Sequence, residues 1–213
     1  MDGSSTEPHS NEAFQTQEYW DARYAREADG DFDWFKTYAD IRDIVHELIP
    51  QRNARILMLG TGNSTLSADM FADGYSDITN IDFSGVLIER MRARQPETKW
   101  LEMDIRDLKT RADELGGAES WDVVLDKATL DALMATKPDE SVWDPPAIVK
   151  ENVAKEVDGV LHVLKPKGVF LYLTFGQPHF RRPLLQREAW QIETRTLGEQ
   201  DMFPYYFYIC RKQ

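Results

Sequence analysis

Residues 54–71 read ARILMLGTGNSTLSADMF, and this stretch decides the fold. Its apolar run at 56–59 predicts a buried strand, and the apolar spacing after the turn predicts a helix. Gly60 and Gly62 lie in the turn between the two. Glycine lets the backbone approach a ligand closely, and the N–H groups that begin the next helix would face that ligand. The stretch therefore predicts a strand, a tight turn and a helix N-terminus, beside which a ligand binds.

The composition indicates one domain with an acidic surface. The chain has 213 residues, 42% of them hydrophobic, which is enough for one sizeable core. It carries 25 basic and 37 acidic residues, a net charge of −12. Such a surface repels phosphate backbones and attracts basic proteins. We therefore expect no direct contact with nucleic acid, and a basic protein as partner; the sequence leaves the oligomeric state open.

Cysteine and histidine usage argues against structural cross-links. Cys210 is the sole cysteine, and the four histidines show no zinc spacing, so we expect neither a disulfide nor a metal. The first residues are polar and acidic, unlike a signal peptide, and no apolar run approaches eighteen residues. These features predict a cytoplasmic protein without a membrane span.

Strands and helices alternate along the chain. We expect residues 1–15 to form a flexible tail and residues 16–213 to form a single domain. The predicted helices cover 17–28, 37–49, 63–73, 84–94, 107–115 and 147–164. The predicted strands cover 55–59, 77–82, 98–103, 121–126, 169–175, 190–197 and 203–210. This order predicts an α/β fold, a Rossmann-like, doubly wound, mostly parallel seven-stranded sheet that ends in an antiparallel hairpin.

Two carboxylates follow neighbouring predicted strands. Asp82 lies 22 residues after Gly60, the spacing expected for a carboxylate that accepts hydrogen bonds from ribose hydroxyls. Asp104 follows the third strand, where it could receive an adenine amine while Ile105 covers the ring. Ser64 replaces the third glycine of a dinucleotide fingerprint, which disfavours a nicotinamide dehydrogenase. An ordinary helix-capping role for Asp82 is the alternative.

Longer motifs resemble a known family. The G-x-G turn, the two strand-end aspartates and the terminal hairpin resemble class I S-adenosylmethionine-dependent methyltransferases. The stretches LGTGNSTLS, NIDFSGVLIERM, VVLDKATLDALMA, EYWDARY and DWF are similar to blocks of the methyltransferase-like proteins that modify lysine in translation elongation factor 1-alpha. The resemblance covers about residues 18–181. Thr61 replaces the family's usual cysteine, and Ala128 replaces the glycine of its DKGTLDAL block.

The resemblance implies a set of site residues. N-terminal helices fold over the cofactor, S-adenosylmethionine, which leaves as S-adenosylhomocysteine. The implied cofactor-binding residues are Trp20, Tyr24, Trp34, Gly60, Gly62, Asp82, Phe83, Asp104, Ile105 and Lys127. For Trp20 and Tyr24, the alternative is a core-facing pair one helical turn apart.

The implied activity is lysine N-methylation, with elongation factor 1-alpha as the substrate. Asp126 and Asp131 flank the end of the fourth strand and are the candidates for orienting the acceptor amine; the alternatives are that Asp126 holds the loop and that Asp131 faces solvent. His179 is a candidate for the acceptor channel or for a capping role, and we interpret the WDPPAI stretch at 143–148 as the start of a helix rather than a catalytic signature. A small-molecule methyltransferase and a non-catalytic cofactor-binding scaffold are the alternative functions.

Overall fold

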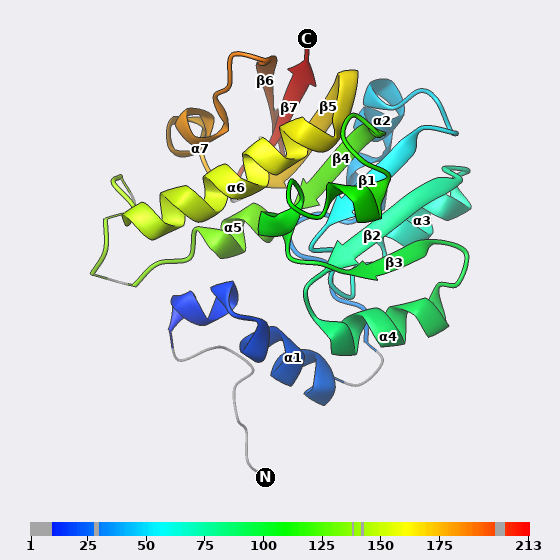
Figure 1. Ribbon diagram of the computed structural model, residues 1–213, viewed down its shortest axis with the longest axis horizontal. Helices are drawn as coiled ribbons and strands as arrows, with labels where there is room; N and C mark the ends of the chain where they lie inside the picture. The colour runs from blue at the N-terminus through cyan, green and yellow to red at the C-terminus, as the bar shows by residue number, and fades with distance from the viewer. Residues whose placement is uncertain (1–9, 28–29, 138, 142, 199–202) are drawn as a thin grey trace.

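The computed structural model describes residues 10–27, 30–137, 139–141, 143–198 and 203–213, and its centre is one seven-stranded sheet (Figure 1). The strands are β1 (Arg55–Leu59), β2 (Asp77–Asp82), β3 (Lys99–Glu102), β4 (Trp121–Lys127), β5 (Leu164–Thr174), β6 (Trp190–Leu197) and β7 (Tyr205–Lys212). Their order is β3-β2-β1-β4-β5-β7-β6. The first five strands pair in parallel, and β7 pairs antiparallel with both β5 and β6. The predicted sheet and its terminal hairpin are confirmed.

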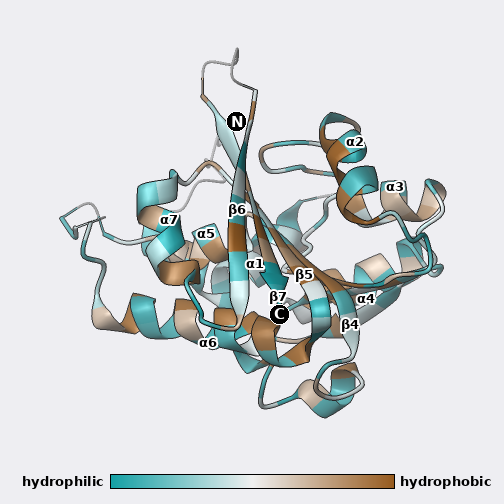
Figure 2. Ribbon diagram, turned by 90° about the horizontal axis from the view of Figure 1, so that it is seen from above, coloured by the Kyte–Doolittle hydropathy of each residue, from teal (hydrophilic) through white to brown (hydrophobic). Residues whose placement is uncertain are grey.

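Helices cover both faces of the sheet (Figure 2). They are α1 (Gln17–Arg26), α2 (Tyr38–Leu48), α3 (Leu66–Ala72), α4 (Gly85–Arg94), α5 (Thr129–Leu133), α6 (Ala147–Val163) and α7 (Pro178–Leu185), with short 3-10 helices η1 (Asn11–Gln15), η2 (Ile105–Asp107) and η3 (Ala112–Leu115). Helices α2 and α3 bury their apolar residues on one face, and α5, α6 and α7 on the other. The N-terminal α1 packs against α4 at the β3 side of the sheet.

The strands are apolar on both sides because both faces are covered. Successive residues of a strand point to opposite faces, so Leu57 and Val124 join the core under α6 while Ile56 and Val123 join the core under α2 and α3. All four side chains are buried. This explains why the sequence shows apolar runs without polar alternation.

Several elements differ from the predicted ranges. Strand β5 begins at Leu164, five residues before the predicted start at Val169. Its pairing with β4 is irregular over these extra residues, where Lys167 has φ 67°. The continuous helix predicted at 107–115 is not formed: η2 ends at Asp107, a turn follows, and η3 covers only the last four of these residues. The sequence analysis did not predict α5 and α7. Helix α6 begins directly after Pro146, which confirms the interpretation of the WDPPAI stretch.

The N-terminal prediction is only partly within the described structure. Residues 1–9 lie outside it, so the expected tail is not tested there. Asn11–Gln15, which the prediction assigned to the tail, form η1, and the Gln15 side chain donates to the carbonyl of Ala135 after α5. Among the described helices, none combines the length and the apolar character needed to cross a membrane.

Candidate functional site

A cavity of about 730 Å³ opens where β1, β2 and β4 end, and its volume suits a cofactor-sized molecule. Its wall contains Gly60 and Gly62 after β1, Asp82 and Phe83 at the end of β2, and Lys127 at the end of β4. All ten residues predicted to bind the cofactor lie in this wall: Trp20, Tyr24, Trp34, Gly60, Gly62, Asp82, Phe83, Asp104, Ile105 and Lys127. The doubly wound fold thus brings the predicted residues together at one edge of the sheet.

The two glycines of the turn have different neighbours. Both adopt left-handed backbone angles, with φ 50° at Gly60 and φ 58° at Gly62. A Cβ at Gly60 would lie 2.2 Å from the methyl carbon of Thr129, whose hydroxyl is 3.0 Å from the Leu59 carbonyl oxygen. A Cβ at Gly62 would lie 3.0 Å from the Tyr24 hydroxyl. Gly60 therefore lets α5 approach the turn, and Gly62 lets α1 approach it.

Asp82 is the buried carboxylate of the site. Its two oxygens accept hydrogen bonds from the backbone N–H groups of Gly62 and Ser84, each at 3.0 Å. Burial raises the pKa of Asp82 to about 6, although these two hydrogen bonds act in the opposite direction. The carboxylate holds the glycine turn, and each oxygen keeps a second lone pair for a ligand hydroxyl. The predicted ribose contact is compatible with this position.

Asp104 is already partnered by its neighbour. It caps η2 by accepting from the Arg106 N–H at 2.8 Å, and both its oxygens meet the Arg106 guanidinium, one of them at 2.5 Å from Nη2. Ile105 is buried beside it and also lines the cavity. The contact of Asp104 with an adenine amine stays a prediction. The adenine amine and Arg106 would both bind the Asp104 carboxylate.

Aromatic rings from the N-terminal segment close the cavity. Trp20 and Tyr24 stack with ring centroids 5.7 Å apart, and Tyr24 also packs on α4. The two alternatives for this pair are therefore compatible, because the rings contribute to a core cluster and line the cavity as well. The Arg23 guanidinium lies 5.3 Å from the Trp20 ring centroid and 5.5 Å from that of Trp34. Phe14 and Phe32, which the sequence analysis missed, belong to the same layer.

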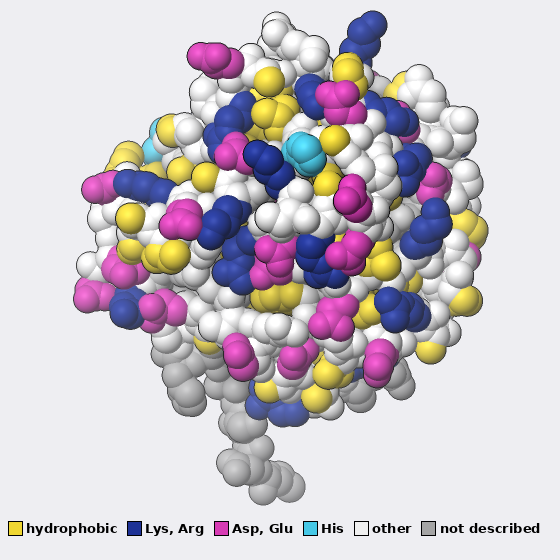
Figure 3. Space-filling view, viewed as in Figure 1, with side chains coloured by type: hydrophobic (Ala, Val, Ile, Leu, Met, Phe, Trp, Pro, Cys, Tyr) yellow, Lys and Arg dark blue, Asp and Glu magenta, His cyan; other side chains and the backbone are white. Residues whose placement is uncertain are grey.

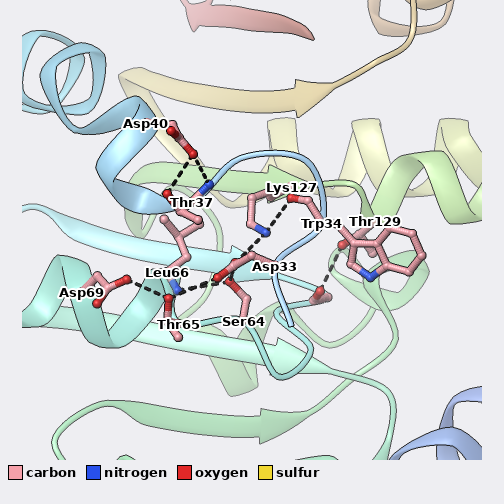
Figure 4. Close-up of polar contacts among 11 residues, drawn as sticks. Asp33, Trp34, Thr37, Asp40, Ser64, Thr65, Leu66, Asp69, Lys127 and Thr129 are labelled. Atoms are coloured by element: carbon pink, nitrogen blue, oxygen red, sulfur yellow. Dashed lines mark hydrogen bonds and ion pairs between the residues drawn. The ribbon is translucent and has the colours of Figure 1, made fainter. Parts of the chain in front are cut away.

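Lys127 fastens this N-terminal segment to the sheet (Figure 4). Its Nζ donates to an Asp33 oxygen at 2.9 Å and to the Trp34 carbonyl at 3.0 Å. Asp33 also accepts from the hydroxyls of Ser64 and Thr65. Burial lowers the pKa of Lys127 and the Asp33 carboxylate opposes this effect. Lys127 lines the cavity, but its ammonium group is used to hold the segment that covers it.

Asp131 lies on the β5 side of the cavity, because it contacts Thr174 at the end of β5, and β1 and β4 separate β5 from β2 in the sheet. One of its oxygens, Oδ1, accepts from the Thr174 hydroxyl and the Arg181 guanidinium, each at 2.7 Å. Its side chain is only 8% exposed, and Oδ2 has no hydrogen-bond partner among the described residues. The alternative that Asp131 faces solvent is therefore wrong. Because Asp131 lines the cavity, a hydrogen-bond donor on a ligand that reaches Oδ2 would satisfy this buried oxygen.

Asp126 does not fit the predicted role. It is fully buried and absent from the cavity wall, so it cannot touch an acceptor amine there. Its oxygens accept from the N–H groups of Thr129 and Leu130, each at 3.0 Å, which caps α5. Glu156 of α6 is a second fully buried carboxyl group whose pKa is influenced by Asp126, and burial raises the pKa of both groups. The alternative that Asp126 holds the loop describes what the structure shows.

Other residues depart from expectation as well. His179 belongs to α7 and stacks on Trp143, and the cavity wall contains its neighbours Phe180 and Arg181 instead. Ala128, which lies in the wall, has φ 75°, the left-handed region that favours the glycine of the family block. No group of three or more His, Cys, Asp or Glu side chains in the described part of the chain could hold a metal.

Comparisons with known proteins agree with this geometry. A family model described as a methyltransferase domain matches residues 50–200. EEF1A lysine methyltransferase 4 of Bos taurus is 37% identical over 212 residues, covering 96% of this chain and 78% of that protein. The mouse protein of the same name is 35% identical over 210 residues. Among solved structures, the magnesium protoporphyrin IX methyltransferase from Synechocystis with bound SAM has a TM-score of 0.60 at 13% identity, covering 95% of this chain and 97% of that one.

The cofactor is S-adenosylmethionine, and the residues present fit it. Asp82 lines the cavity with a carboxylate that would accept hydrogen bonds from ribose hydroxyls. The aromatic layer supplies ring faces that attract a sulfonium cation. The chain belongs to the class I S-adenosylmethionine-dependent methyltransferases, in the group that includes the EEF1A lysine methyltransferases.

Proposed function

We propose that this protein methylates the side-chain amine of a lysine in translation elongation factor 1-alpha. The relatives with 35% and 37% identity carry that substrate in their names. The observation in the structure that carries the proposal is Asp131, which lines the cavity and whose Oδ2 is buried without a hydrogen-bond partner among the described residues. A buried carboxylate on the β5 side of the cavity, with β1 and β4 between it and Asp82 of β2, suits an incoming amine.

The chemistry requires alignment and a neutral amine. S-adenosylmethionine supplies a methyl group on a cationic sulfur, and an attacking nitrogen displaces the sulfur in line. A site that aligns the two reactants lowers the barrier by ~7–11 kcal/mol. Deprotonating a lysine with a reference pKa of about 10.4 at pH 7 costs roughly 4.6 kcal/mol. The chain must therefore bind the amine, orient it and favour its neutral form.

Asp131 and Arg181 divide these tasks. Asp131 accepts a hydrogen bond from the amine and directs its lone pair, because Thr174 and Arg181 fix the carboxylate through Oδ1. The Arg181 guanidinium, with only 9% of its side chain exposed, places a positive charge close to the bound amine. This charge disfavours the protonated amine and therefore favours its neutral form. The Nε of Arg181 also donates to the buried Tyr172 hydroxyl at 3.1 Å, which fixes the orientation of the guanidinium.

The test is methyl transfer with purified components. We expect the protein to move a labelled methyl group from S-adenosylmethionine to a lysine of elongation factor 1-alpha, located by mass spectrometry. Asp131→Asn should lower kcat about 100-fold, because the amide has lost the charge that attracts the amine, while cofactor affinity stays unchanged. Labelling of metabolites without any protein would indicate a small-molecule methyltransferase. Cofactor binding without transfer to any protein would indicate a scaffold.

Partner and location belong to the same proposal. The net charge of −12 supports a basic protein as the partner, and it disfavours nucleic acid and anionic membranes. Because the proposed substrate works in translation, we propose a cytoplasmic location. Fluorescence imaging of the tagged protein, with a nuclear marker as the reference, tests the location independently of activity.

A further inference from the structure

Three aromatic side chains form an exposed cluster beside the cavity. Trp143, between α5 and α6, stacks on His179 of α7 with centroids 5.3 Å apart and planes at 24°. Phe180 contacts both rings, at 4.6 Å from Trp143 and 4.0 Å from His179. Trp143 is nevertheless 75% exposed, the most exposed large hydrophobic side chain of the described residues. We call Trp143, His179 and Phe180 the aromatic platform.

The platform lies beside the part of the cavity wall that contains Asp131. Phe180 belongs to the cavity wall, as does Pro145, two residues beyond Trp143. The next residue of α7, Arg181, is the ion-pair partner of Asp131. A protein that inserts a lysine toward Asp131 must therefore rest on the surface that surrounds this part of the cavity.

Charge indicates what kind of surface would rest there. Residues 137–144 contain one lysine and three acidic residues, and the Asp144 side chain is 82% exposed. The whole chain carries a net charge of −12. Figure 3 shows acidic and basic side chains interspersed on one face of the molecule, without a single large patch of either sign. A second copy of the chain would be repelled, whereas a basic surface is attracted.

We propose that the aromatic platform is the docking site for a basic surface segment of the folded protein whose lysine is methylated. The proposal rests on the proposed function, because it assumes a protein acceptor. The exposed Trp143 ring offers its face to an arginine or lysine side chain of the substrate. The contact with His179 and Phe180 holds the ring before binding, so little conformational freedom is lost on association.

The test separates docking from chemistry by steady-state kinetics. Purified elongation factor 1-alpha is varied at saturating S-adenosylmethionine with the wild type, Trp143→Ala, Trp143→Phe and Val86→Ala. Val86 is exposed on α4, away from the platform, and serves as the matched control. We expect Trp143→Ala to raise KM for the protein about tenfold or more, as for an interface anchor, with kcat nearly unchanged. Trp143→Phe keeps an aromatic face, so its KM for the protein should rise by less than about threefold.

Calorimetry supplies the second readout. The dissociation constant for S-adenosylmethionine should be the same in all four proteins, which shows that the cavity is intact. An unchanged KM in Trp143→Ala would overturn the docking proposal while leaving the proposed function standing. A loss of self-association in Trp143→Ala without a change in KM would assign the platform to a second copy and would also overturn it. Absence of transfer by the wild type would refute the proposed function, and with it the docking proposal.

Discussion

The buried carboxyl pair of Asp126 and Glu156 predicts a specific pH dependence of stability. Both side chains are fully buried, and the charge of the Asp126 carboxylate acts on Glu156. Asp126 receives two backbone N–H groups, whereas neither oxygen of Glu156 meets a donor. The proton therefore resides on Glu156, whose pKa is raised well above its usual value by burial and by the Asp126 carboxylate. The charges of Asp131 and Asp104 also raise the pKa of Glu156.

The perturbation is Glu156→Gln, which keeps a hydrogen-bond donor without a titrating proton. In the wild type, the folded state binds one proton that the unfolded chain releases above its pKa of about 4.3. The free energy of unfolding should therefore fall by about 1.4 kcal/mol per pH unit as the pH rises from that value through the raised pKa of the folded state. Glu156→Gln should remove this slope and be more stable than the wild type at neutral pH.

Urea unfolding followed by tryptophan fluorescence at pH 5.5, 6.5 and 7.5 measures the effect. The relevant quantity is the difference between variant and wild type, because other groups titrate equally in both. Glu151→Gln is the matched control, since Glu151 lies on the same helix, pairs with Lys155 and is 59% exposed. If the free energies of unfolding of Glu156→Gln and the wild type change in parallel with pH, the reasoning is refuted. The folded wild type would then bind no more protons than its unfolded chain.

Three further substitutions test the cavity and its closure. Asp82→Ala should weaken S-adenosylmethionine binding at least about tenfold, because hydrogen bonds to a charged group contribute about 1.5–3 kcal/mol; calorimetry showing an unchanged dissociation constant would contradict the ribose contact. Ala128→Gly should relieve the left-handed strain at φ 75° and raise stability by ~1 kcal/mol, visible as a higher melting temperature; an unchanged or lower value would show that no strain is present. Lys127→Met should destabilise the fold by ~3 kcal/mol, because it leaves the carboxylate of Asp33, 13% exposed, without its cation; Lys127→Met combined with Asp33→Asn should recover part of the loss in urea unfolding, and additive losses would argue against coupling.

The parallel strands were predictable because a strand that is buried on both faces appears in the sequence as a short continuous apolar run. The bounds of β1, β2 and β6 agree with the prediction to the residue. Helix α5 escaped prediction because five residues are too short to show helical periodicity. Helix α7 contains Pro183, and an internal proline normally argues against a helix.

The cavity wall was predicted better than the contacts within it. Strand ends of a parallel sheet meet at one edge, so residues after β1, β2, β3 and β4 were expected together, and they are. The pairs that fix the side chains are separated by 94 residues for Lys127 and Asp33, and by 50 for Arg181 and Asp131. No local pattern identifies such pairs, because only the folded topology makes them neighbours. For the same reason Asp126 looked like a cavity residue, although its side chain turns inward to cap α5.

Helix α5 connects these observations. An isolated five-residue helix is not stable in water, so α5 depends on its tertiary contacts. Asp126, with Glu156 acting on its charge, caps the helix N-terminus from the core. Thr129 fills the space that Gly60 leaves at the turn, and Asp131 lines the cavity. A change beneath the helix therefore moves both the turn beside the cofactor and the proposed amine acceptor. This is why a substitution at Glu156, which touches neither ligand, should shift the pH dependence of stability and of methyl transfer together.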